Sequence, residues 1–106
     1  MTDVFNIPAF RFPKNFLWGS STAAFQIEGN NVWSDLWHDE QERLRRDPSA
    51  EVSGTACNSY QMYREDAALL KTLGHQAYRF GIEWARIEPE EGVFNEEATN
   101  HYVQQL

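Results

Sequence analysis

Residues 58–87, NSYQMYREDAALLKTLGHQAYRFGIEWARI, contain the pattern that decides the fold class of this chain. In 58–73 the apolar side chains recur at spacings of three and four, which predicts an amphipathic helix. Gly74 follows directly and can adopt the left-handed conformation that ends a helix. In 77–87 apolar and polar residues alternate instead, which predicts a strand.

The segments on either side extend this order of elements. The apolar run FLWG at 16–19 predicts a buried strand, and the small residues after it suit a tight exit from that strand. Residues 30–55 are polar and predict a long loop with a short surface helix over 39–47. After a turn marked by proline and glycine, Asn95 can cap a further helix whose first turn carries two carboxylates.

The resulting order is strand, long loop, helix, strand and the start of a helix. A helix that crosses between two strands favours parallel pairing, because antiparallel strands joined by a hairpin need no such crossover. The expected fold class is therefore α/β. Two parallel strands do not form a closed sheet, so we expect open edges and an exposed apolar face at Tyr78, Phe80, Ile82 and Trp84.

The composition, with 42% hydrophobic and 24% charged residues among 106, is that of an ordinary soluble globular protein. A net charge of −7 opposes binding to nucleic acid or to an anionic membrane surface. No apolar run is long enough to span a membrane and the start lacks the pattern of a secretion signal, so we expect a cytoplasmic location. The single cysteine, Cys57, can supply neither an internal disulfide nor a structural zinc site.

Two polar side chains near the predicted strands are candidates for a functional site. Gln26 follows the first strand, where α/β proteins place their sites, and its amide can hydrogen-bond sugar hydroxyls or simply satisfy the backbone of a loop. Arg79 lies in the second strand, where its planar guanidinium can fix a carboxylate. An ion pair with Glu83 or Asp66, or plain exposure, is the commoner reason for such an arginine.

Three further groups of residues have side chains that could take part in chemistry. They are the tryptophans Trp18, Trp33, Trp37 and Trp84, the glutamates Glu83, Glu88, Glu90 and Glu91, and the histidines His38, His75 and His101. Aromatic residues near strands belong to a core more often than to a sugar-binding platform. Most of the glutamates fall at a turn, which predicts a solvated acidic surface rather than a pair of catalytic carboxyls. The histidine spacings match no metal motif and no glycine-rich phosphate loop is visible, so we expect neither a metal nor a cofactor.

Longer stretches of the sequence resemble a known family. FRFPKNFLWGSSTAAFQIEG, SDLW and CNSYQMYREDAALLKTLGHQAYRFGIEWARIEPEEGVFNEE are similar, in order and spacing, to the N-terminal quarter of the family 1 glycoside hydrolases, the β-glucosidase and β-galactosidase group. The resemblance covers nearly the whole chain from Phe12 onward. It implies part of a (β/α)8 barrel, a fold that takes about 250 residues, so we expect residues 1–106 to be the N-terminal part of one glycosidase domain.

The resemblance also implies roles for particular residues. Gln26 matches the glutamine that hydrogen-bonds the sugar in the glycone subsite, and Arg79 matches the arginine that contacts the catalytic nucleophile. The two catalytic glutamates of the family lie in motifs like NEP and ENG, neither of which occurs here. Gly81 and Asn58 stand where many members have serine and aspartate, and Gly81 resembles the archaeal-type branch.

Two hypotheses follow from these observations. In the first, the chain is part of a retaining β-glycosidase that acts on terminal β-linked glucose or galactose, and it is inactive alone because both catalytic glutamates are missing. In the second, it is a noncatalytic sugar-binding or protein-interaction module derived from such a barrel. In that second case we expect self-association or a complementary fragment as partner, because unpaired strand edges pair with other strands.

Overall fold

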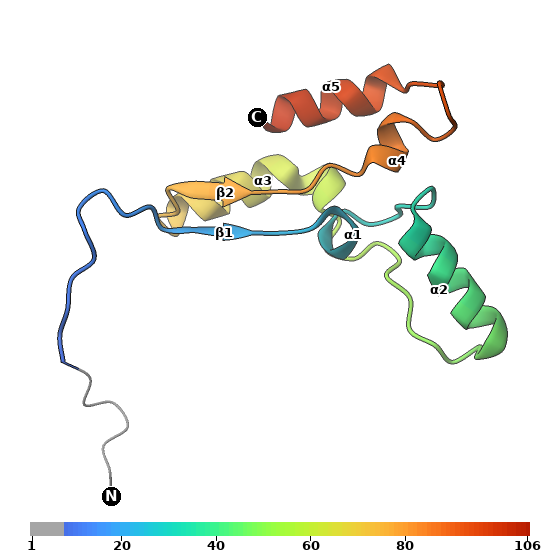
Figure 1. Ribbon diagram of the computed structural model, residues 1–106, viewed down its shortest axis with the longest axis horizontal. Helices are drawn as coiled ribbons and strands as arrows, with labels where there is room; N and C mark the ends of the chain where they lie inside the picture. The colour runs from blue at the N-terminus through green and yellow to red at the C-terminus, as the bar shows by residue number, and fades with distance from the viewer. Residues whose placement is uncertain (1–7) are drawn as a thin grey trace, which may run out of the picture.

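The computed structural model describes residues 8–106 and contains two short parallel strands with helices around them (Figure 1). The strands are β1, Gly19–Ser21, and β2, Ala77–Arg79. The helices are α1 Ala24–Ile27, α2 Asp35–Arg46, α3 Ser59–Thr72, α4 Trp84–Ile87 and α5 Glu96–Gln105. The parallel pairing of β1 with β2 confirms the expected α/β arrangement.

Strand β1 lies later in the chain than the sequence predicts, and it is exposed rather than buried. The predicted strand at 16–19 is wrong because β1 pairs through Gly19 and the two serines, with Gly19 opposite Ala77. At Gly19 a Cβ atom would overlap the Ala77 carbonyl, so the close approach of the two strands requires glycine. Phe16 and Trp18 instead form a tilted aromatic cluster with Phe12 at the N-terminal side of β1.

Strand β2 is shorter than predicted. It ends at Arg79, and the last part of the predicted strand over 77–87 forms the single-turn helix α4. Glu83 begins this turn, because its side chain accepts a hydrogen bond from the Ala85 amide at 3.4 Å and its carbonyl accepts one from the Arg86 amide at 3.0 Å. Alternating apolar and polar residues form a strand only where a neighbouring strand is available to pair with them. The register of β1 with β2 ends at Arg79, so the residues after it have no partner strand in this sheet.

The longer helices follow the sequence closely. Helix α2 begins before the predicted 39–47, because the Ser34 hydroxyl caps it by accepting from the Trp37 amide at 3.1 Å. Helix α3 agrees with the prediction, and Gly74, which has a φ of 82°, lies just after its last turn. Asn95 caps α5 by accepting from the Ala98 amide at 3.1 Å, as expected.

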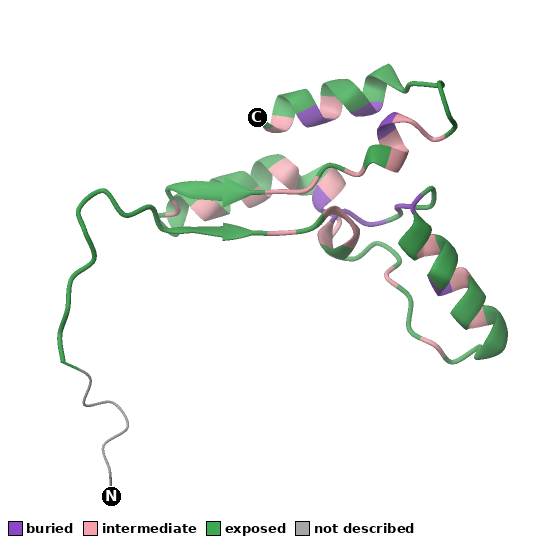
Figure 2. Cartoon of the chain, viewed as in Figure 1, coloured by how far each residue is buried: buried purple, intermediate pink, exposed green. Residues whose placement is uncertain are grey.

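The buried apolar core is small. It consists of Ile87, Ala98 and Tyr102, with Tyr60 and Phe80 packed against it. Purple residues lie at the start of α3, on α4 and α5, on the loop between α1 and α2 and on α2, whereas the strands are green throughout (Figure 2). The radius of gyration is 18.9 Å, against about 13 Å for a compact domain of this length.

The open strand face expected from the sequence is found only in part, because of its four residues only Tyr78 belongs to a strand. Tyr78, Ile82 and Trp84 are 37%, 49% and 58% exposed, while Phe80 is half-buried against the core. Within residues 8–106, no helix has the length and apolar character needed to cross a membrane.

Candidate functional site

Gln26 and Arg79 both lie at the carboxyl ends of the strands. Arg79 is the last residue of β2 and pairs with Ser21, the last residue of β1. The Thr22 amide continues the pairing by donating to the Arg79 carbonyl at 3.0 Å. Gln26 follows on α1, and both side chains are exposed to solvent. The topology therefore brings the two candidates to the same end of the sheet, which is the end where parallel α/β folds carry their sites.

The guanidinium of Arg79 has no hydrogen-bond or ion-pair partner in the part of the chain that the structure describes. The predicted ion pairs with Glu83 and Asp66 are therefore wrong. The Glu83 carboxylate caps α4, and Asp66 lies on α3 at the opposite face of the sheet. Of the structural alternatives for Arg79, plain exposure is the one observed.

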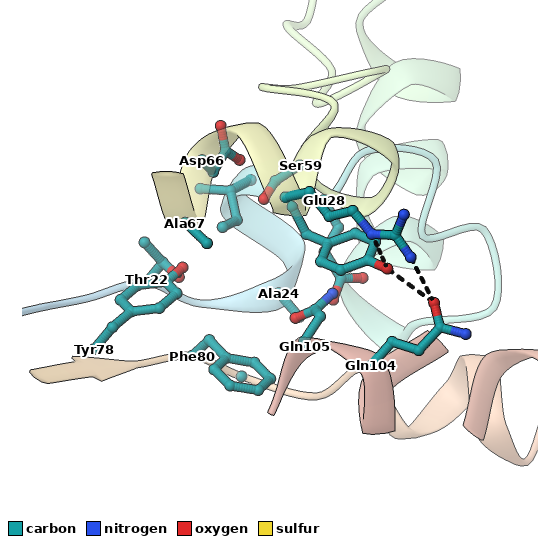
Figure 3. Close-up of a pocket in the computed structure, with 14 residues that line it drawn as sticks. Thr22, Ala24, Glu28, Ser59, Asp66, Ala67, Tyr78, Phe80, Gln104 and Gln105 are labelled. Atoms are coloured by element: carbon teal, nitrogen blue, oxygen red, sulfur yellow. Dashed lines mark hydrogen bonds between the residues drawn. The ribbon is translucent and has the colours of Figure 1, made fainter. Parts of the chain in front are cut away.

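A cleft of about 260 Å³ lies between the strands and the helices α3 and α5 (Figure 3). Tyr78 and Phe80 line it, and the Tyr78 hydroxyl lies 2.5 Å from the Thr22 hydroxyl. Neither Gln26 nor Arg79 lines this cleft. Because successive side chains of a strand point to opposite faces, Arg79 lies on the face of the sheet away from these helices.

A buried polar cluster fixes the segments that follow the two strands. We name it the Glu28 cluster, and its members are Glu28, Asn31, Tyr60, Arg86 and Tyr102. Arg86 Nε donates to Glu28 Oε2 at 3.0 Å and to Asn31 Oδ1 at 2.6 Å, and the Arg86 guanidinium lies 3.8 Å from the centre of the Tyr60 ring. The Tyr102 hydroxyl donates to the Glu28 carboxylate at 2.7 Å. The cluster thus joins α1, α3, α4 and α5.

The electrostatics of the cluster keep its two tyrosines protonated. Burial, together with the hydrogen bond and the negative charge of Glu28, raises the pKa of Tyr102 far above its ordinary value. Burial also raises the pKa of Tyr60, although the Arg86 charge opposes this shift. Tyr102 therefore keeps its proton and donates a hydrogen bond to Glu28, and the Arg86 guanidinium lies beside the same buried side chain.

One polar side-chain atom of the cluster is buried without a hydrogen bond to any of the described residues. Asn31 is 2% exposed, and among residues 8–106 its Nδ2 has no hydrogen-bond partner. Its Oδ1 accepts from Arg86, and its carbonyl accepts from the Ser34 hydroxyl at 2.8 Å. The side chain is therefore held in one orientation by its oxygen alone.

The sequence analysis did not identify the Glu28 cluster. Glu28 and Arg86 are 58 positions apart, and no spacing rule connects them. The available signal was local: each is a charged residue inside a short apolar run, FQIEG and WARI. Buried charges need partners, so two such residues of opposite sign could have been proposed as a pair.

The other candidate residues take different places from those expected. Trp18, Trp33 and Trp84 are 52%, 57% and 58% exposed, so the expectation that they belong to a core is wrong for the described chain. Glu88 lies at the predicted acidic turn, where it accepts from the Gly92 amide and from the Trp84 indole, both at 2.8 Å. Three or more potential metal ligands come together nowhere in 8–106.

Comparison with known proteins identifies the group to which this architecture belongs. The sequence profile described as glycosyl hydrolase family 1 matches residues 9–106. Myrosinase 1 of Brevicoryne brassicae is 42% identical over 94 residues, which are 81% of this chain and 19% of that protein. The chain therefore spans about a fifth of the length of this relative.

Solved structures give the same result. The crystal structure of β-glycosidase BGL167 superimposes with a TM-score of 0.79 at 53% identity, over 89% of this chain and 22% of the other. The β-glycosidase from Pyrococcus horikoshii has a TM-score of 0.77 at 47% identity, over 89% and 21% of the two chains. The expected architecture, part of a (β/α)8 barrel, is thereby confirmed. This chain belongs to glycosyl hydrolase family 1.

Proposed function

We propose that the chain forms part of the sugar-binding site of a retaining β-glycosidase that hydrolyses terminal β-linked glucose or galactose. The observation that carries this proposal is the position of Gln26 and Arg79: both are exposed at the carboxyl ends of adjacent parallel strands. Active sites of (β/α)8 enzymes are built at this end of the barrel. Family membership and the similarity to β-glycosidases support the same assignment.

The proposed reaction uses two carboxyl groups that this chain does not supply. One protonates the leaving oxygen, and the other attacks the anomeric carbon to form a glycosyl-enzyme intermediate that water then cleaves. Gln26 contributes an amide that both donates to and accepts from neighbouring sugar hydroxyls. Arg79 contributes a fork of N–H groups for the nucleophilic carboxylate, and its positive charge keeps that carboxylate ionised.

The test is a grafted barrel, in which residues 9–106 of this chain replace the matching part of β-glycosidase BGL167. We expect the graft to hydrolyse aryl β-glucosides and the chain alone to be inactive, since loss of catalytic groups costs several powers of ten in rate. Gln26→Ala in the graft should lower kcat/KM without changing the melting temperature. A Gln26→Ala graft with the kinetics of its parent would refute the assigned role, and so would hydrolysis by the isolated chain.

A noncatalytic interaction module is the second candidate, and the open strand face favours it. Tyr78 on β2, Ile82 after it and Trp84 on α4 are exposed apolar side chains, and the two-stranded sheet leaves its outer strand edges unpaired. Such a surface binds a chain that adds further strands. The occupant that fits is polypeptide carrying the later strands and helices of a family 1 barrel. Mixing this chain with the remainder of BGL167 distinguishes the candidates, because a stable but inactive complex supports the module and recovered hydrolysis supports the enzyme.

A further inference from the structure

Helix α1, which carries Gln26, has few stabilising interactions among its own residues. It has four residues, none of them buried, and its N-cap residue Ala23 makes no side-chain capping hydrogen bond. A single helical turn is unstable in water, because the entropy lost in fixing its backbone outweighs the free energy gained from its few hydrogen bonds. The position of Gln26 must therefore be set by contacts that lie outside α1.

Glu28 provides these contacts directly after α1. Its carboxylate accepts from Arg86 on α4 at 3.0 Å and from Tyr102 on α5 at 2.7 Å, and its carbonyl accepts from the Tyr60 amide at the start of α3 at 3.3 Å. Its amide closes the turn of α1 by donating to the Ala24 carbonyl at 2.9 Å. One buried residue therefore connects the turn that carries Gln26 to three other helices.

The same cluster holds the segment that follows Arg79. The Glu83 amide donates to the Tyr102 hydroxyl at 3.1 Å, and Arg86 follows on α4. Gly81, between Arg79 and Glu83, lies against α1 so closely that a Cβ there would be 3.1 Å from the Ala24 amide nitrogen. The chain after β1 and the chain after β2 are thus in contact, and hydrogen bonds from Arg86 to Glu28 also join them.

We propose that Glu28, through Arg86 and Tyr102, is a positioning residue that sets where Gln26 lies relative to Arg79 in the sugar site. A buried ion pair adds little stability over apolar residues of the same volume, but its hydrogen bonds fix directions that an apolar contact leaves free. The proposal rests on the proposed function, because it assigns Glu28 an effect on catalysis that requires Gln26 to bind the sugar.

The first test measures the coupling of Glu28 with Gln26 in the grafted barrel. Misplacing a substrate-binding group by about 1 Å can cost on the order of 100-fold in rate. We expect Glu28→Gln to lower kcat/KM for an aryl β-glucoside by about 10- to 100-fold, and to have no further effect when Gln26 is already alanine. Tyr102→Phe, which removes one hydrogen bond and keeps the volume, should show a smaller loss with the same dependence on Gln26.

Glu40→Gln is the matched control. Glu40 is also buried, at 6% exposed, and accepts two hydrogen bonds, but from Ser53 and on helix α2. Its effect on kcat/KM should be small and should add to that of Gln26→Ala. If Gln26→Ala alone has no effect, the proposed function fails. If Gln26→Ala lowers kcat/KM but the loss from Glu28→Gln simply adds to it, the proposed function stands and the positioning role is overturned.

The second test uses the grafted barrel and needs no activity. The amide of Gln26 donates to the Ala23 carbonyl at 3.1 Å, so its hydrogen exchange reports on the order of α1. We expect Glu28→Gln to speed this exchange by about tenfold or more, and Glu40→Gln to leave it unchanged. Equal exchange in the Glu28→Gln graft and in its parent would overturn the proposal, even where hydrolysis is too slow to measure.

Discussion

The Glu28 cluster and the open face of the sheet differ in the kind of side chain that they bury or expose. In the cluster four helical segments meet, and even charged groups such as Glu28, 4% exposed, leave water. On the sheet only two strands meet, and even apolar groups such as Tyr78, 37% exposed, stay in contact with water. Burial here is determined by how many segments converge on a place rather than by how apolar its residues are.

The largest expected effect concerns the open face. We expect the chain alone to bind a hydrophobic dye strongly, to show no sharp cooperative unfolding at low concentration, and to have a mass above that of a monomer when concentrated, because exposed apolar surface promotes association. Fluorescence, thermal unfolding and analytical ultracentrifugation measure these properties. A compact monomer with a cooperative transition and no dye binding would show that the open face closes in solution.

The second prediction concerns a variant that removes the central carboxylate of the Glu28 cluster. Glu28→Ala leaves the Arg86 charge partly buried without its partner, and we expect a loss of about 3–5 kcal/mol in the local stability of α5. Amide hydrogen exchange in α5 measures it. The control is Glu42→Ala, which breaks the exposed pair with Arg45 on α2 and should cost less than about 1 kcal/mol. Similar losses in the two variants would mean that the cluster behaves like an exposed ion pair.

The third prediction compares two residues of α4. Ile87 is 7% exposed and Trp84 is 58% exposed. We expect Ile87→Ala to reduce the local stability of α5 by about 2–5 kcal/mol, because it opens a cavity in the core. Trp84→Ala removes an exposed ring and its hydrogen bond to Glu88, and should cost about 1 kcal/mol or less in this chain. The order of the two losses, read from the same exchange experiment, would be reversed if Trp84 packed inside the chain.

The smallest effect is a dependence on pH at His101, which stacks on Tyr60 with 3.7 Å between ring centres. Burial first, and the Arg86 charge second, lower the pKa of His101. The folded chain therefore favours neutral His101. Its contribution to stability is complete above the unfolded pKa of about 6.5 and is lost as the pH falls from there toward the folded value. NMR titration of the His101 ring, in buffer and in urea, should give the lower midpoint in buffer; equal midpoints would contradict the sign.

Local signals in the sequence determined the helices. Ser34, Gly74 and Asn95 act on backbone groups only a few residues away, so their effects could be predicted without knowing the rest of the structure. The crossover helix between the strands likewise predicted parallel pairing, and the number of apolar residues on two strands predicted an open face. The motifs that resemble family 1 predicted the family, because they match in order and spacing over most of the chain.

Only the tertiary structure decided the strand boundaries and the partners of the buried charges. β1 begins at Gly19 because the Ala77 carbonyl lies against it, and β2 ends at Arg79 because the chain then turns into α4. Glu28 and Arg86 meet because four helical segments converge, and nothing in the 58 positions between them encodes that contact locally. Hydrogen bonds within a few residues depend on local conformation, whereas contacts between distant residues depend on the path of the whole chain.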